Sequence, residues 1–113
     1  MSKKKKIKKR KRKADDTASS RIGIAWYRRE QWDRLLEISS DRDELEDTYD
    51  EWQAMAEENL RKLAQHGYML RKVDIDVEEL LSWCNSQNRN VDGDARSEFT
   101  VVKLRELNEA GKQ

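Results

Sequence analysis

Basic side chains crowd the first thirteen residues of this chain, and their chemistry is the binding of polyanions. Ten Lys or Arg residues stand there in a run that only Ile7 interrupts. Such a cluster neutralises phosphates without a folded site, and its binding is independent of base sequence. We therefore expect RNA or DNA as a partner, bound through this basic arm: Lys3, Lys4, Lys5, Lys6, Lys8, Lys9, Arg10, Lys11, Arg12 and Lys13.

Aromatic residues adjoin arginines at one place, the segment Trp26-Tyr27-Arg28-Arg29. Aromatic rings stack on bases where a surface is electropositive, so Arg28 and Arg29 are a second candidate contact for nucleic acid. The surrounding sequence is mainly acidic, which favours core packing for the aromatic residues as a group. These are Trp26, Tyr27, Trp32, Tyr49, Trp52, Tyr68 and Trp83.

An acidic stretch lies between residues 41 and 58, where nine Asp or Glu residues oppose the single Arg42 and leave a net charge of −8. Such a run usually forms a solvated helix face, but it also offers a surface to cations. We expect either a basic protein partner or the chain's own basic arm to dock there. The residues predicted to bind it are Asp43, Glu46, Asp47, Asp50 and Glu51.

The residue types that usually perform catalysis are few and isolated. His66, the only histidine, precedes Gly67, where a histidine commonly binds the last carbonyls of a helix. Cys84 lies on the apolar side of a predicted helix, as a small buried thiol would. One histidine and one cysteine cannot supply a structural zinc site, and the four glycines are too scattered for a phosphate loop. We expect a non-enzymatic protein without a cofactor.

The polar segment 88–99 matches a calcium-binding loop only in part. Counted from Asn88, oxygen-bearing residues and a glycine fall at the third, fifth and sixth positions, as an EF-hand requires. The twelfth position holds Phe99 in place of the bidentate glutamate, and Glu98 comes one place early. The segment is therefore predicted to be a turn in which Asp92 or Asp94 caps the next helix, and no metal site is expected.

The part of the chain after the basic arm, here called the body, must position these side chains. Its clearest pattern is the helical spacing of its apolar residues. Apolar residues recur every three or four positions and predict one long helix from Asp41 to His66. Asp41 and Glu44 form a D-x-x-E pattern typical of a helix start, and Gly67 is typical of a helix end.

The remaining elements follow from similar signals. A second D-x-x-E pair, Asp76 and Glu79, predicts a helix that ends near Asn85. Further helices are predicted over 30–38 and 94–108, and strands over 22–26 and 69–75. Because two strands alone make a marginal sheet, we expect them to pair and lie against the helices. The predicted fold class is α+β, mostly helical, with two short strands and about four helices; an all-α bundle is the alternative.

The distribution of charged and apolar residues along the sequence predicts that the chain is divided into an arm, a domain and a tail. Residues 1–20 are expected to form a disordered polybasic arm with a hinge, because like charges repel and no core can form. Residues 21–110 are expected to form a single small globular domain, followed by a tail over 111–113. No stretch is apolar enough for membrane insertion, and the arm lacks a second membrane anchor. A lone cysteine suits a cytoplasmic location, or a nuclear one in a eukaryote.

The segment from Ile24 to Trp52 combines an Ile-Ala-Trp-Tyr opening, a tryptophan-leucine helix and an acidic helix with Asp-Thr-Tyr. In these features it resembles a group of small uncharacterised bacterial proteins. The resemblance covers residues 22–107 and excludes the basic arm. It implies a bacterial, cytoplasmic origin and no particular activity.

Two functions remain open at this point. In the preferred one, the chain is a small non-enzymatic accessory protein whose arm attaches it to RNA, ribosomes or DNA, while the acidic helical body contacts a protein partner. In the alternative, the body is a protein-interaction or regulatory module, antitoxin-like, and the arm is a solubilising or targeting appendage. Homodimerisation is compatible with both.

Overall fold

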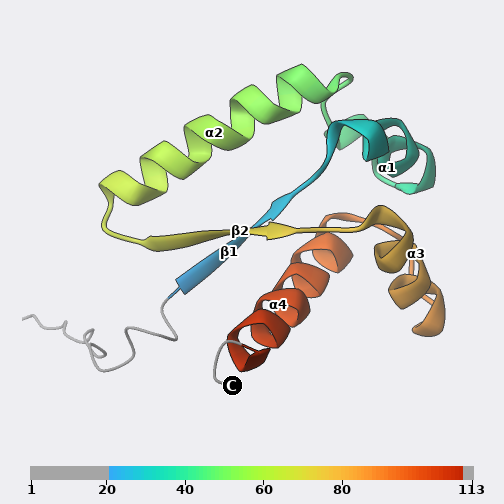
Figure 1. Cartoon of the computed structure of the whole chain (residues 1–113). Coiled ribbons are helices and arrows are strands. Elements are labelled where there is room, and N and C mark those ends of the chain that lie inside the picture. Colours follow the sequence, from blue (N-terminus) through green and yellow to red (C-terminus); the bar gives the residue numbers. More distant parts are fainter. Residues whose placement is uncertain (1–20, 111–113) are drawn as a thin grey trace, which may run out of the picture.

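The structure is a computed structural model that describes residues 21–110; the predicted arm and tail lie outside these residues. Its elements follow the predicted order of strand, two helices, strand and two helices (Figure 1). The two strands are β1 (Arg21–Trp26) and β2 (Met69–Asp74). The helices are the 3-10 turn η4 (Arg29–Gln31), α1 (Trp32–Ile38), the 3-10 turn η5 (Arg42–Glu44), α2 (Tyr49–Gln65), α3 (Val77–Ser86) and α4 (Gly93–Ala110).

The two strands pair in parallel, with Arg21 opposite Met69 and Trp26 opposite Asp74. Side chains alternate across the strands, so α2 and α4 cover opposite faces of this ribbon (Figure 1). Trp26 packs against Trp52 of α2, with ring centroids 5.0 Å apart. On the other face, Gly23 lies so close to Leu104 of α4 that a Cβ atom would come within 3.1 Å of the leucine side chain. A glycine thus permits the close approach of α4 to β1.

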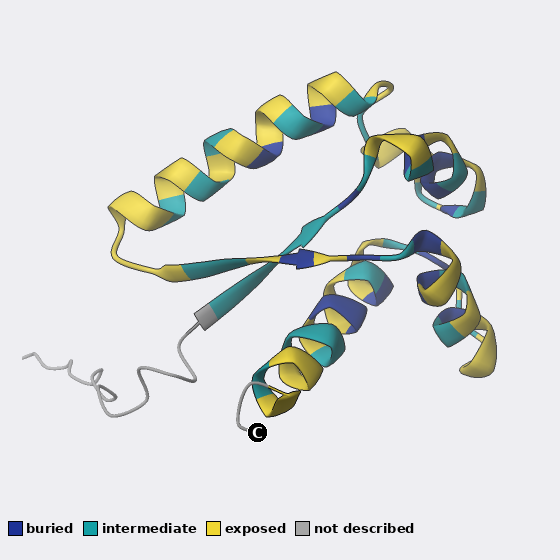
Figure 2. Cartoon of the chain, in the orientation of Figure 1, coloured by how far each residue is buried: buried dark blue, intermediate teal, exposed yellow. Residues whose placement is uncertain are grey.

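The core lies where α1, α3, the carboxyl ends of the strands and the first turns of α4 meet (Figure 2). Its largest fully buried side chains are aliphatic or sulfur-containing and come from several elements: Leu35, Val73, Ile75, Val77, Leu80 and Cys84. By contrast, the second half of α2 is exposed over most of its surface (Figure 2). The body is therefore well packed at one end and open at the other.

The predicted start of the long helix was wrong by eight residues. The helix α2 begins at Tyr49, and the hydroxyl of Thr48 accepts a hydrogen bond from the Glu51 amide at 3.1 Å. Asp41 does not cap it, because its carboxylate binds Arg96 of α4 instead. The end of the helix was predicted correctly, since Gly67 follows it with a φ of +90°.

The predicted fold class is confirmed, and so are the other predicted helices and strands. The protein is mostly helical with two short paired strands, which excludes the all-α bundle. Asp76 caps α3 by accepting a hydrogen bond from the Glu79 amide at 3.0 Å. No helix within residues 21–110 combines the length and the apolar character needed to cross a bilayer.

Candidate functional site

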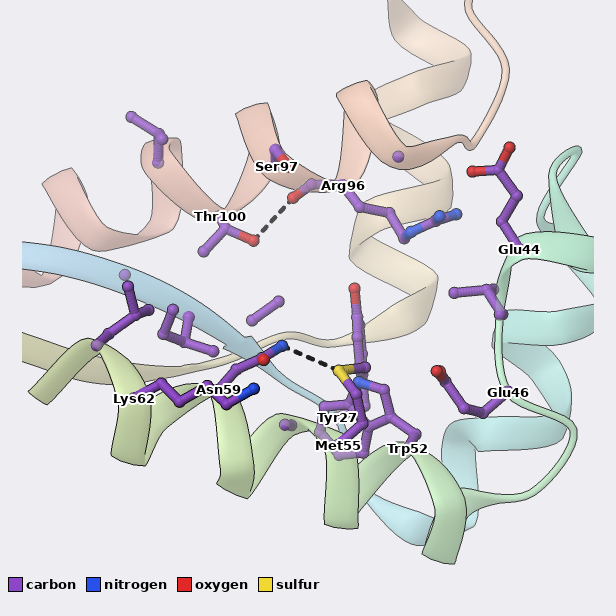
Figure 3. A pocket seen from close by; sticks show the side chains of 18 residues that line it. Tyr27, Glu44, Glu46, Trp52, Met55, Asn59, Lys62, Arg96, Ser97 and Thr100 are labelled. Carbon is purple, nitrogen blue, oxygen red and sulfur yellow. Dashed lines mark hydrogen bonds between the residues drawn. The ribbon is translucent and has the colours of Figure 1, made fainter. Parts of the chain in front are cut away.

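A groove of about 730 Å³ runs between α2 and α4, with β1 along its base. Its lining is mainly apolar, and its volume falls within the range of about 300–1,000 Å³ found for ligand-binding clefts. Figure 3 shows Met55 and Asn59 of α2 opposite Ser97 and Thr100 of α4. Val101, 52% exposed, lines the α4 wall. The groove is thus a concave surface bounded by two helices and one strand.

The backbone of β1 contributes polar groups to this groove. The Ile75 amide donates to the carbonyl of Trp26 at 3.1 Å, which shows that the backbone groups of Trp26 point towards β2. Because these directions alternate along a strand, Gly23 and Ala25 direct their N–H and C=O groups to the opposite side. We call this side the open edge of β1. Within residues 21–110 no strand pairs with it, and both Gly23 and Ala25 line the groove.

An ion pair closes the groove near the end of β1. The Arg96 guanidinium donates two hydrogen bonds to the Asp41 carboxylate, at 2.7 and 2.8 Å, and a third to the Ser39 hydroxyl at 3.1 Å. The Gly93 amide also donates to Asp41, at 3.0 Å. The hydrogen bonds from Arg96 hold the pKa of Asp41 below its ordinary value. The pair fastens the segment around η5 to the start of α4.

Tyr27 stands beside this pair, with its hydroxyl facing Arg96 in Figure 3. Burial raises the pKa of Tyr27 to about 12, and the nearby Asp41 carboxylate adds to the rise while Arg96 opposes it. Burial thus favours the neutral phenol over the phenolate.

His66 and Cys84, the only histidine and cysteine of the chain, both occupy structural positions. Burial raises the pKa of the Cys84 thiol, which disfavours the nucleophilic thiolate. The Nδ1 atom of His66 lies 2.8 Å from the carbonyl oxygen of Lys62, as predicted for a helix end. Within residues 21–110 no three His, Cys, Asp or Glu side chains are placed to hold a metal ion. In the segment 88–99, which matches a calcium-binding loop only in part, Asp92 accepts a hydrogen bond from the Ala95 amide at 2.9 Å, the predicted capping role.

The two arginines predicted to contact nucleic acid are already engaged by carboxylates. Arg28 lies 3.2 Å from Asp74, and Arg29 donates to Asp50 at 2.7 Å while its guanidinium lies 4.7 Å from the centre of the Tyr49 ring. The ten arm residues lie outside the described residues. The aromatic residues mostly pack in or against the core, as predicted, except for Tyr68, which is 50% exposed.

The five acidic residues predicted to bind a partner do not share one helix face. Asp43 belongs to η5, and Glu46 and Asp47 belong to the segment that connects η5 to α2. Asp50 and Glu51 lie in the first turn of α2. Of the five, only Glu46 lines the groove. Glu44, which the sequence suggested only as a cap, lines it as well.

The groove itself was not foreseen from the sequence. Its two walls come from helices that are about forty positions apart in the sequence. Asn59 of α2, for example, lies in one wall and Thr100 of α4 in the other. The one local signal was the pair of small residues Gly23 and Ala25 within a strand, since small residues often mark a close approach of backbone to another group. Comparison with family models, curated proteins and solved structures found no match.

Proposed function

We propose that this protein is a small non-enzymatic accessory protein of the cytoplasm, attached to RNA, ribosomes or DNA through its basic arm, with an acidic body that holds a protein partner. The observation that supports this most is the separation of charge. Residues 21–110 contain 13 basic and 21 acidic residues, a net charge of −8, whereas the first thirteen residues carry ten positive charges.

The contacts of the body support assigning nucleic acid to the arm alone. A phosphate approaching Arg28 or Arg29 would have to displace Asp74 or Asp50 and would meet their negative charges. The exposed surface of the body would therefore repel a polyanion more than it attracts one. The groove between α2 and α4 gives the same body a concave, mainly apolar surface for another protein.

The test is fluorescence anisotropy with labelled single-stranded RNA and duplex DNA. The full chain is compared with a variant in which the ten basic arm residues are replaced by glutamine, which keeps the length and leaves the body unchanged. Non-specific binding of roughly 10⁻⁴ to 10⁻⁶ M is expected near physiological salt. With six to ten phosphate contacts, affinity should fall about 10³- to 10⁵-fold between about 50 and 200 mM salt.

The variant is expected to lose this binding. Equal binding by both proteins would contradict the assignment of nucleic acid to the arm. If neither protein binds, the alternative function is favoured, in which the body is an interaction or regulatory module and the arm an appendage. The groove is the observation that favours this second candidate, because it exists without the arm.

A further inference from the structure

We propose that the open edge of β1 is a docking site for one extended peptide segment of a protein partner, which adds a strand to the sheet inside the groove. The segment has apolar side chains at alternate positions and a basic side chain at the end that lies beside Glu44 and Glu46. This inference rests on the proposed function, because it identifies how the acidic body holds its protein partner.

The hydrogen-bonding groups of the open edge favour a strand over other ligands. Gly23 and Ala25 each direct an amide and a carbonyl towards the groove, and no other hydrogen bond from the described residues reaches them. The third carbonyl on this side, that of Tyr27, accepts a hydrogen bond from the Tyr49 hydroxyl at 2.8 Å, which ends the available edge. Strand addition satisfies alternating groups of this kind through main-chain hydrogen bonds.

The sheet also has fewer strands than a parallel sheet usually contains. Parallel sheets occur almost only with both faces covered, and a ribbon of two strands is marginal by itself. Here α2 and α4 cover the two faces and extend beyond β1 as the walls of the groove, so there is covered space for another strand. Met55 and Val101 are exposed on these walls and would contact alternate side chains of the added strand.

The shape of the groove selects a single segment over a second copy of this chain. In a second copy, β1 would lie at the base of its own groove, between its own α2 and α4. The helices of the two copies would meet before the two strands could pair. An isolated segment of about six residues, as long as β1 at about 3.3 Å per residue, has no such obstacle.

Charge determines which ends of the segment fit. Glu44 and Glu46 lie at the end of the groove next to the carboxyl end of β1, and neither forms an ion pair with another described residue. Arg96 lies nearby, but its charge is balanced by Asp41. Lys62 lies at the opposite end (Figure 3). A segment with a basic residue beside Glu44 and Glu46 and a carboxylate beside Lys62 complements the charges at both ends of the groove.

The test begins with a displayed library of random peptides, roughly six to eight residues long to match β1, selected against the full-length protein. The enriched peptides are then synthesised and titrated into isotope-labelled protein, with the amide signals followed by NMR. We expect peptides with alternating apolar residues and a basic residue at one end. Their binding should shift the amide signals of Gly23 and Ala25 more than those of the exposed face of α2.

Three variants examine the geometry. Ala25→Pro removes an amide on the open edge without removing one that faces β2, and should weaken binding by about tenfold or more per lost hydrogen bond. Glu46→Lys should abolish the preference for a basic residue. Asp43→Lys is the matched control, because it makes the same charge change in the same region but does not line the groove. Circular dichroism verifies that each variant is folded.

A peptide N-methylated at alternate amides provides a test that needs no protein variant, and it should bind about tenfold more weakly or worse. The inference is overturned if no peptide is enriched, or if enriched peptides bind Ala25→Pro and the parent equally. It is also overturned if the Gly23 and Ala25 amides are protected from exchange without peptide, since the chain's own segment or a second copy would then occupy the edge.

The outcomes separate this inference from the proposed function. If the protein binds RNA through its arm and a protein partner through another surface, while the peptides fail, only the strand addition is wrong. If the peptides bind the open edge and no nucleic acid binds the arm, the strand addition stands and the accessory function is wrong.

Discussion

Arg96 and Asp41 join two segments that lie 55 positions apart in the sequence, through two charge-assisted hydrogen bonds of 2.7 and 2.8 Å. Their side chains are only 11% and 17% exposed. The carboxylate accepts a further hydrogen bond from the Gly93 amide, so it is well satisfied. The pair holds the segment that carries Glu44 and Glu46 against the start of α4, and all three of Arg96, Glu44 and Glu46 line the groove.

Removal of one member of this pair should lower the stability of the folded protein strongly. Arg96→Ala would leave the mostly buried Asp41 carboxylate without its cation, and the free energy of unfolding is expected to fall by about 3 kcal/mol. Urea unfolding followed by tryptophan fluorescence measures the change. The control is Arg89→Ala, which breaks the more exposed pair with Glu98 and should lower the free energy of unfolding much less. Equal losses in the two variants would show that the Arg96 pair has no special structural role.

The same pair predicts how stability depends on pH. Hydrogen bonds from Arg96 make the pKa of Asp41 lower in the folded state than in the unfolded state, so the folded protein binds fewer protons. The stability that Asp41 contributes to the folded state is therefore fully present above the pKa of this carboxyl in the unfolded chain, about 3.9. It is lost as the pH falls through the lower pKa of the same carboxyl in the folded protein.

Thermal unfolding from neutral pH to below about pH 4 should show this loss. In Asp41→Asn the fall in stability with acidification should be shallower than in the parent, although other carboxylates still titrate. Identical pH profiles for the two proteins would contradict the assignment.

The observed start of α2 makes a prediction that differs from the sequence pattern. Thr48→Ala removes the hydroxyl that accepts from the Glu51 amide, and should lower the free energy of unfolding by about 1 kcal/mol. Glu44→Ala changes the residue that the D-x-x-E pattern placed in the first helical turn. It should alter stability by less than about 0.5 kcal/mol, as surface substitutions usually do. The opposite ranking of these variants in urea unfolding would indicate that the helix begins near Asp41.

The approach of α4 to β1 depends on the missing side chain of Gly23. Gly23→Val would place a branched side chain where a Cβ already comes within 3.1 Å of Leu104 and 3.2 Å of Val73. Such overpacking should cost about 1–3 kcal/mol. In the control, Gly93→Ala, the nearest atoms to the new Cβ lie at 3.7 and 3.8 Å, which is ordinary contact. Thermal unfolding of the two variants provides the comparison, and an unchanged melting temperature for Gly23→Val would contradict the close packing.

The local features of this protein could be predicted from short stretches of its sequence. The type and order of the main helices and strands, the cap at Asp76 and the stop at Gly67 depend on neighbours within one or two helical turns, so short-range patterns revealed them. The same patterns could not distinguish Asp41, which resembles a cap, from Thr48, which is one. The difference is Arg96, whose guanidinium reaches Asp41 only after the chain has folded.

Tertiary structure alone decided the parallel pairing, the open edge of β1 and the groove. Pairing direction depends on the path of the chain between β1 and β2, and the edge that remains open depends on which backbone groups face β2. The groove requires side chains of α2 and α4 to lie opposite each other, and neither helix encodes the other's position in its own periodicity. Contacts between distant residues are set by the packing of the whole body, so they become visible only in three dimensions.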